Sequence, residues 1–175
     1  MKNYIAILVV LIIVYLILTK SKSKGMLSGT AKDSRELKGN DKLVEHIKKF
    51  EGYKATPYKS LEGGADTIGY GHKFAKNEKI ITFLSPSEAE QLLKKDIVER
   101  GENIVRNKLG ARKVTQREFN LLIDLAFGTG TIYNHVLASL DRGTLEKDYT
   151  TKAVTINGEF SQGLLNRRKH ALQTL

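Results

Sequence analysis

The hydrophobic pattern at the start of the chain has no polar interruption. Residues 4–18 read YIAILVVLIIVYLIL, and none of these side chains is charged. The run is slightly short for a membrane-spanning helix, although the long side chains of Lys2 and Lys20 can reach the two interfaces. A cleaved signal peptide is the alternative, but no Ala-x-Ala-like site follows the run. We therefore expect a retained transmembrane anchor over residues 1–19 that contacts lipid through residues 4–18.

The next segment, residues 20–40, has no apolar periodicity. It reads KSKSKGMLSGTAKDSRELKGN and is rich in Lys, Ser and Gly. Such a composition is typical of a flexible linker with a basic start beside a membrane. The pattern thus predicts an anchor over 1–19, a basic flexible linker over 20–40 and one folded domain over 41–175.

From Asp41 onward the apolar positions follow a helical period. They are Leu43, Val44, Ile47 and Phe50. The helix is expected to end near Glu51 and Gly52, because glycine commonly follows the last helical turn. A passage rich in turn residues follows, and it leads into a short strand predicted over Thr67–Gly71.

The second half of the domain is predicted to be helical. Ser85–Glu88 is a capping box with proline at the first helical position, and Thr115–Glu118 is a second capping box. Apolar residues follow both boxes at helical spacing, and Gly128 and Gly130 are expected to end the second helix. A small N-terminal β-sheet followed by a helical C-terminal lobe gives an α+β fold that is mostly α.

The composition excludes several classes of chemistry. The chain has no cysteine, which rules out disulfides, thiolate nucleophiles and cysteine-ligated metals. Its four histidines have no metal-site spacing, so no metal and no cofactor are expected. The formal net charge of +10 suits a nucleic acid, an anionic membrane or a bacterial cell wall. Nucleic acid is not expected as a partner, because the interleaved aromatics and motifs of such proteins are missing.

One carboxylate stands out as a candidate catalyst. Glu51 follows an apolar residue at the end of an amphipathic helix, just before a glycine and the turn-rich passage. A half-buried carboxyl group at such a place favours its neutral form and suits a general acid. The alternative is an ordinary surface glutamate at a frayed helix end.

The strand beside this glutamate would carry two different faces. In an extended strand, Thr67, Gly69 and Gly71 share one side, which would form a flat shelf where a bulky ligand can approach the main chain. His72 would lie on the opposite, core-facing side with Ile68 and Tyr70. We interpret His72 as a structural residue, with Asp96 as its partner.

These residues resemble the signature of a known family. FEGYKATPYKS and TIGYGH are similar to the amino-terminal motifs of the phage-type, T4-like lysozymes, the endolysin family of glycoside hydrolases. SPSEAEQLLKKDI, VTQREFNLLIDLAFGTG and GLLNRRKHAL resemble later blocks of that family and occur in its order. The resemblance covers residues from about 41 to 175 and implies a lysozyme-like domain.

The resemblance also implies roles for single residues. Glu51 matches the catalytic glutamate and Thr67 the catalytic threonine, while Arg167 matches an arginine close to the glutamate. The remaining matches are the structural pair His72 and Asp96, the cleft-lining Phe127 and the shelf glycines Gly69 and Gly71. The implied substrate is bacterial peptidoglycan, which would lie on the shelf and be cut between MurNAc and GlcNAc.

The chain departs from the family at Ser60, where the second catalytic carboxylate is expected. Serine can hydrogen-bond a water molecule but cannot take its proton, so Glu62 or Asp66 would have to substitute, with Glu62 the better candidate. A lytic transglycosylase cuts the same bond with one glutamate and releases 1,6-anhydro products. The sequence slightly favours a hydrolytic muramidase, because Thr67 is present.

Two hypotheses of other classes remain. A catalytically silent, wall-binding membrane protein would require a disabled Glu51, which is intact, and a basic nucleic-acid binder is supported only by charge. The expected enzyme is a single-pass membrane protein with a monomeric catalytic domain, acting when a phage penetrates its host or lyses it. It would sit either in the host inner membrane with the domain in the periplasm or in the membrane of a virion. Lys20, Lys22 and Lys24 mildly favour a cytoplasmic domain by the positive-inside rule, which conflicts with a wall substrate.

Overall fold

The computed structural model describes residues 29–59, 66–152, 154–156 and 158–175. Residues 31–175 form one unit by their internal contacts. The predicted anchor lies outside the described residues. Within those ranges, no helix combines the length and the apolar character needed to cross a bilayer.

The domain begins earlier than the sequence pattern predicted. Strand β1 (Lys32–Asp33) pairs with β5 (Lys113–Val114) in an antiparallel ladder, and a 3₁₀ turn, η1 (Ser34–Glu36), follows. The Ser34 hydroxyl donates a hydrogen bond to the Gly110 carbonyl at 2.6 Å. The prediction of a flexible linker up to residue 40 is therefore wrong for residues 31–40. Its polar composition concealed short pairings whose partners lie some eighty residues away along the chain.

Helix α2 (Asp41–Glu51) occupies the predicted segment. The Asn40 side chain caps its start by accepting a hydrogen bond from the Leu43 N–H, and Gly52 follows its last residue with a φ of 69°. This left-handed conformation favours glycine and lets the chain turn sharply. As a result Glu51 stands at the helix end, where its side chain leaves the core.

A three-stranded antiparallel sheet follows, in the order β2–β3–β4. Its strands are β2 (Lys54–Lys59), β3 (Asp66–Gly69) and β4 (His72–Lys73). The predicted single strand Thr67–Gly71 is wrong, because the chain reverses after Gly69, so that Ile68 pairs with His72. Gly69 and Gly71 have φ angles of 65° and 83°, and glycine adopts such positive angles without strain.

A long helical rod joins the sheet to the rest of the domain. It consists of α3 (Pro86–Ile97), a π-helical turn η2 (Val98–Glu102) and α4 (Asn103–Leu109). The predicted capping box at Ser85 and Glu88 is confirmed. A β-carbon at Gly101 would lie 2.6 Å from Ile123 Cγ2, so the rod packs closely on α5 at this point.

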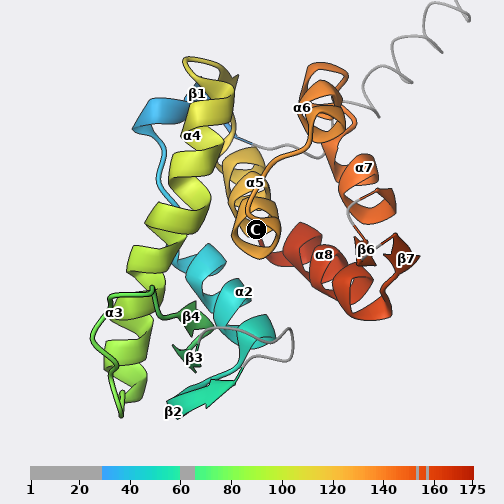
Figure 1. The fold of residues 1–175 in the computed structure, drawn as a ribbon. Helices are drawn as coiled ribbons and strands as arrows, with labels where there is room; N and C mark the ends of the chain where they lie inside the picture. Colours follow the sequence, from blue (N-terminus) through green and yellow to red (C-terminus); the bar gives the residue numbers. More distant parts are fainter. Residues whose placement is uncertain (1–28, 60–65, 153, 157) are drawn as a thin grey trace, which may run out of the picture. The chain divides into compact units, whose positions relative to one another are not determined.

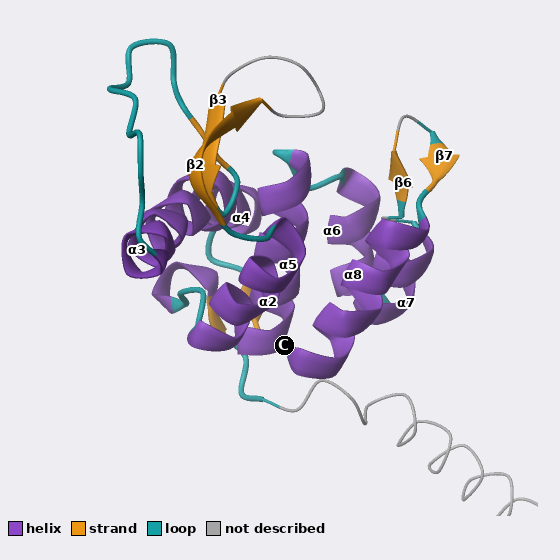
Figure 2. Ribbon diagram, turned by 90° about the horizontal axis from the view of Figure 1, so that it is seen from below, coloured by secondary structure: helices purple, strands orange, loops and turns teal. Residues whose placement is uncertain are grey.

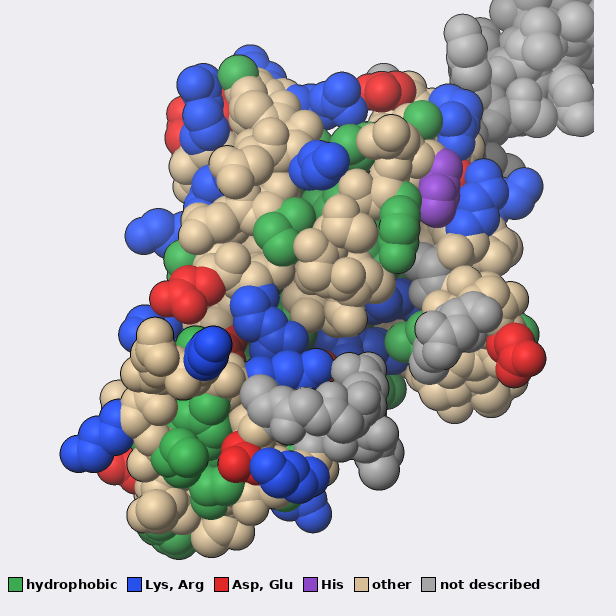
Figure 3. Space-filling view, in the orientation of Figure 1, with side chains coloured by type: hydrophobic (Ala, Val, Ile, Leu, Met, Phe, Trp, Pro, Cys, Tyr) green, Lys and Arg blue, Asp and Glu red, His purple; other side chains and the backbone are tan. Residues whose placement is uncertain are grey.

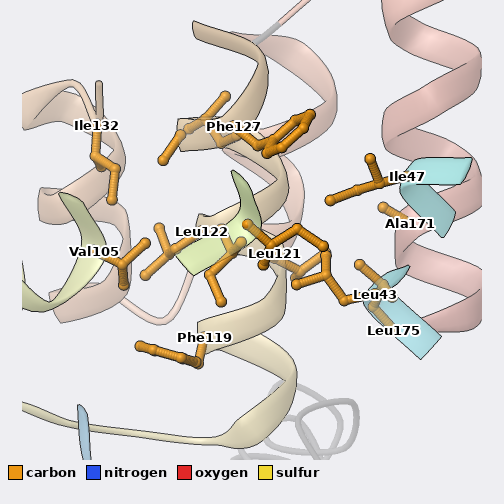
Figure 4. Packing of buried hydrophobic residues seen from close by; sticks show 14 of the residues in the cluster. Leu43, Ile47, Val105, Phe119, Leu121, Leu122, Phe127, Ile132, Ala171 and Leu175 are labelled. Atoms are coloured by element: carbon orange, nitrogen blue, oxygen red, sulfur yellow. The ribbon is translucent and has the colours of Figure 1, made fainter. Parts of the chain in front are cut away.

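Helix α5 (Gln116–Thr129) forms the centre of the core. The predicted capping box at Thr115 and Glu118 is confirmed, and the helix ends at Gly130 in the left-handed conformation. Every residue from Phe119 to Phe127 is buried. Figure 4 shows side chains of α5 surrounded by apolar side chains from the neighbouring helices. Continuous burial explains why the segment looks apolar on all sides.

The chain ends in a helical group beside α5 (Figure 1). Its elements are α6 (Asn134–Asp141), α7 (Leu145–Thr151), the hairpin β6 (Thr155–Ile156) and β7 (Glu159–Phe160), and α8 (Gln162–Thr174). Figure 2 shows the sheet β2–β3 at one edge of a mostly helical body. A smaller apolar cluster under that sheet contains Ile68, Phe74, Leu84 and Ala89. The predicted α+β, mostly helical fold is confirmed.

Candidate active site

The candidate acid Glu51 makes an ion pair with Arg167, which comes from α8. The Nη1 of Arg167 donates to Glu51 Oε1 at 2.7 Å. The Glu51 side chain keeps 26% of its surface exposed, whereas that of Arg167 keeps 11%. A ligand can therefore reach the carboxyl group while a nearly buried guanidinium holds it from behind. The structure thus places Arg167 beside Glu51, as the family resemblance implied.

Gly71 brings the turn of the hairpin against the same carboxyl group. A β-carbon at Gly71 would lie 3.3 Å from Glu51 Oε2, in a backbone conformation that disfavours other residues. The absence of a side chain therefore lets the turn approach the acid closely.

The predicted shelf of Thr67, Gly69 and Gly71 does not exist as one face. A β-carbon at Gly69 would lie 3.4 Å from both Leu84 Cδ1 and Ala89 Cβ, so this glycine faces α3 and the smaller apolar cluster. Thr67 is only 2% exposed. Strand alternation does not extend to Gly71, because the chain reverses after Gly69, and the positive φ of Gly69 ends the extended geometry at that residue.

Phe127 is buried rather than open to a cleft, which corrects its expected place. Its side chain belongs to the main core and is 2% exposed. The guanidinium of Arg100 covers the ring, with its carbon 4.4 Å from the ring centroid. Arg100 also donates to the Gly71 carbonyl at 3.2 Å and to the Phe127 carbonyl at 3.4 Å. The sequence reasoning did not single out Arg100, which ties the hairpin turn to the end of α5.

The predicted contact between His72 and Asp96 is present. His72 Nδ1 lies 2.9 Å from Asp96 Oδ1, and its Nε2 lies 3.0 Å from Glu78 Oε1. Burial raises the pKa of Asp96, and the opposing hydrogen bond with His72 does not cancel this effect. The hydrogen bond from the Ala75 backbone N–H lowers the pKa of Glu78. These contacts fasten β4 to α3 and to the loop that follows β4.

A buried carboxylate behind Arg167 was missed by the sequence reasoning. Asp124 on α5 is fully buried, accepts a hydrogen bond from Arg167 Nε at 2.8 Å and also binds Arg168 and Tyr149. Burial by itself would raise the pKa of Asp124, but Arg167, His46 and Arg168 hold it well below its usual range. One signal was present: LLIDLAF places a single acid in an otherwise apolar helical run. Such an acid must be paired inside the core.

Ser60, which occupies the position of the family's second carboxylate, lies outside the described residues, and so does Glu62. Asp66, the other candidate, makes an ion pair with Lys59 at 2.7 Å. Across the described ranges, no three His, Asp or Glu side chains lie close enough to hold a metal ion.

Lys and Arg side chains gather on one face of the domain. Figure 3 shows them near the middle of that face, between the sheet and the C-terminal helices. Such a concentration of positive charge attracts a polyanionic ligand to this face.

Comparisons with known proteins agree with this architecture. The family model described as "Phage lysozyme" matches residues 48–171. An endolysin from Escherichia coli O157:H7 phage FAHEc1 is 24% identical, with a TM-score of 0.64 over 79% of this chain and 93% of that chain. The muramidase domain of SpmX from Asticaccaulis excentricus is also 24% identical, with a TM-score of 0.61 over 79% and 97%.

A third structure, the active form of the P1 phage endolysin Lyz, is 16% identical, with a TM-score of 0.64 over 90% of this chain and 91% of that chain. At these identities the structural matches show a shared fold. No curated protein sequence matches the chain.

Proposed function

The chain belongs to the phage lysozyme family, and from this premise we propose that Glu51 is the acid with which it cleaves the β-1,4 bond between MurNAc and GlcNAc. Family membership makes the chain a peptidoglycan-cleaving muramidase. The observation that carries the assignment of Glu51 is its ion pair with the nearly buried Arg167, at an exposed helix end beside the hairpin turn.

The first step is proton transfer to the leaving group. The Glu51 carboxyl group protonates the glycosidic oxygen as the bond to the muramoyl C1 breaks, and positive charge develops on that sugar. Arg167 holds one carboxylate oxygen, which leaves the other oxygen, next to Gly71, to face the substrate. The chain around the acid thus fixes its orientation before the sugar arrives.

For the second step we propose hydrolysis, with the attacking water held by Ser60. An inverting glycosidase normally uses a second carboxyl group about 6.5–9.5 Å from the first. The chain has serine at that position, so Ser60 would orient the water, and the proton that the water loses as its oxygen bonds to C1 would pass to Glu62 or to solvent.

The serine also supports a second candidate, the lytic transglycosylase reaction. In that reaction Glu51 first acts as acid and then as base, and the muramoyl 6-hydroxyl attacks C1. No second carboxylate is needed. Mass spectrometry of the released muropeptides separates the two reactions, because 1,6-anhydro ends are lighter by one water. Reducing ends support hydrolysis, and anhydro ends would replace it with transglycosylation while Glu51 keeps its role.

Replacement of Glu51 by glutamine tests the central assignment. Glu51→Gln keeps the shape of the side chain but cannot donate a carboxyl proton, so wall lysis should fall by about two orders of magnitude or more. The matched control is Glu45→Gln on the same helix, where the exposed carboxylate pairs with Lys48. Near wild-type lysis by Glu51→Gln would remove this residue from the mechanism.

We propose that residues 4–18 anchor the enzyme in a membrane, with the lytic domain facing the wall. The uncharged apolar run and its flanking lysines support this location. After expression the intact chain should fractionate with membranes, whereas a chain starting at residue 29 should stay in the soluble fraction. Recovery of the intact, uncleaved chain in the soluble fraction would contradict the anchor.

A further inference from the structure

A line of buried contacts extends from the candidate acid into the core. Arg167 binds Glu51 through Nη1 and Asp124 Oδ1 through Nε, at 2.7 and 2.8 Å. The same Asp124 oxygen lies 3.2 Å from Nε2 of His46, whose side chain is fully buried. Arg167 and His46 therefore share one carboxylate oxygen.

His46 is in turn paired with a second histidine. Its Nδ1 lies 2.9 Å from Nδ1 of His170, and the two rings are stacked. Only one proton fits between these two nitrogens, so one ring donates and the other accepts. We assign a proton to Nε2 of His46 in both arrangements, because this nitrogen faces the Asp124 carboxylate. The pair can therefore take up one additional proton, and His46 then becomes a cation beside Asp124.

The histidine pair is accessible from solvent on its other side. His46 and His170 line a pocket of about 620 Å³ together with Lys49 and Thr174. Burial lowers the pKa of His170, with smaller contributions from Lys49 and His46 in the same direction. His170 therefore favours its neutral state and is suited to accept the shared proton from His46.

We propose that Asp124 is a positioning residue for Glu51, acting through Arg167, and that protonation of the His46–His170 pair weakens this hold. The proposal rests on Glu51 as the catalytic acid.

Electrostatics gives the direction of the effect. When the pair is neutral, Asp124 binds the two arginines, and its negative charge offsets the positive charge that Arg167 presents to Glu51. An imidazolium at His46 competes with Arg167 for Oδ1 and repels the guanidinium. It also adds positive charge behind Glu51, which favours the ionised form of a carboxyl group over the proton-donating form.

Other titratable and charged groups surround the pair. Four of them, Asp41, Lys42, Glu45 and Lys49 on α2, line its pocket. On the other side lies Asp124 of α5, to which Tyr149 of α7 and Arg167 and Arg168 of α8 are bound. The two acids and two lysines of α2 balance each other, so they do not cancel the charge gained by the pair. The hold should be complete at neutral pH and weaken in the acid range, because the lowered pKa of His170 moves proton uptake by the pair to lower pH.

The first test is Asp124→Asn in the full chain, assayed on purified peptidoglycan below the melting temperature of the variant. Asparagine keeps an acceptor oxygen but removes the charge. We expect kcat to fall about tenfold or more with KM changed by less than about twofold, and the alkaline limb of the pH profile to move to lower pH. A folded variant with wild-type kcat and pH profile would overturn the positioning role.

The second test does not depend on the stability of Asp124→Asn. His46→Gln and the half-exposed His170→Gln remove the titrating pair, and the readout is the ratio of kcat at about pH 5.5 to kcat at about pH 7.5. We expect this ratio to rise about threefold or more in both variants. His135→Gln is the matched control, because His135 is exposed, stacks on Tyr133 and has no described hydrogen bond or ion pair with Asp124 or with the histidine pair.

Failure of this proposal can be distinguished from failure of the proposed function of Glu51. If Glu51→Gln retains lysis, the assignment of the acid fails. If Glu51→Gln is inactive but both histidine variants keep the wild-type ratio, only the proposed weakening by protonation fails. If the histidine variants have a lower melting temperature but an unchanged kcat ratio, the His46–His170 pair is purely structural.

Discussion

The His72–Asp96 and His46–Asp124 pairs join the same two types of side chain in different environments. In the first pair the histidine keeps 14% of its side chain exposed, whereas both side chains of the second pair have no exposed surface. Yet the pKa is raised for the less deeply buried Asp96 and lowered for Asp124. Asp124 has two arginines bound to it, while Asp96 binds a histidine alone among the described contacts. Burial therefore does not fix the charge of a core carboxylate; the number of cations bound to it does.

The largest loss of stability is expected when Asp124 is replaced, because this carboxylate binds two buried arginines. Asp124→Ala leaves the guanidinium groups of Arg167 and Arg168 buried without their shared anion, which should cost about 3–5 kcal/mol of the free energy of unfolding. Denaturant titration measures this loss. Asp141→Ala is the control, since its pair with Arg112 lies at the surface. Equal losses in the two variants would contradict the view that Asp124 is essential to the core.

A smaller effect is expected at the partly exposed pair. His72→Ala removes the ties from β4 to Asp96 and Glu78, and the free energy of unfolding should fall by about 1–3 kcal/mol. Lysis at a permissive temperature should be retained, because His72 fastens the sheet to α3 rather than touching Glu51. Lost lysis with an unchanged melting temperature would instead assign His72 to the reaction.

The two aspartates should also respond to pH in opposite directions. The folded-state pKa of Asp124 lies below the ordinary value of 3.8, so its contribution is present above that pH and is lost as the pH falls further. The folded-state pKa of Asp96 lies above 3.8, so its contribution is present below that pH and is lost as the pH rises through the raised pKa. Unfolding free energies measured for wild type and Asp96→Asn should diverge on the alkaline side of 3.8. Parallel curves would show that Asp96 has an ordinary pKa.

The smallest effect is expected for the outer partner of His72. Glu78→Gln weakens the contact with His72 Nε2, but one third of the Glu78 side chain is exposed. Water and salt screen such pairs, so the loss should be about 0–1 kcal/mol by thermal unfolding. A loss as large as that of His72→Ala would show that His72 stabilises the fold mainly through Glu78 rather than through Asp96.

The parts of the fold that could be predicted from sequence are those specified locally. The capping boxes at Ser85 and Thr115 and the glycine after Glu51 define helix ends through contacts within a few residues. The contact of Glu51 with Arg167 followed from the family resemblance alone, whereas the partnership of His72 with Asp96 was proposed from the strand pattern and also matched the family.

What could not be predicted depends on contacts distant in sequence or on the exact point of a chain reversal. Residues 32–33 find their strand partner at 113–114, and no local pattern announces that pairing. The chain reversal after Gly69 removed Gly71 from the strand face on which it was expected. Asp124 is a single acid in an apolar helix, and the sequence does not show that its buried partner is Arg167, which lies more than forty residues further along the chain. The roles predicted for Ser60, Thr67 and Gly71 in binding or catalysis stay predictions, whereas Gly69 faces α3 and Phe127 is buried in the core, away from the places predicted for them.

The π-helical turn Val98–Glu102 restricts where residues can be inserted into or deleted from this part of the chain. It carries Arg100, which binds the hairpin turn, and Gly101, which packs on Ile123. In a helix each residue advances the side chains by about 100° around the axis, so one added or deleted residue here would rotate α4 relative to α3 by that angle. The buried Val105 and Leu109 would then face away from α5. The rod should therefore accept many substitutions along its outer face, but insertions and deletions only at its two ends.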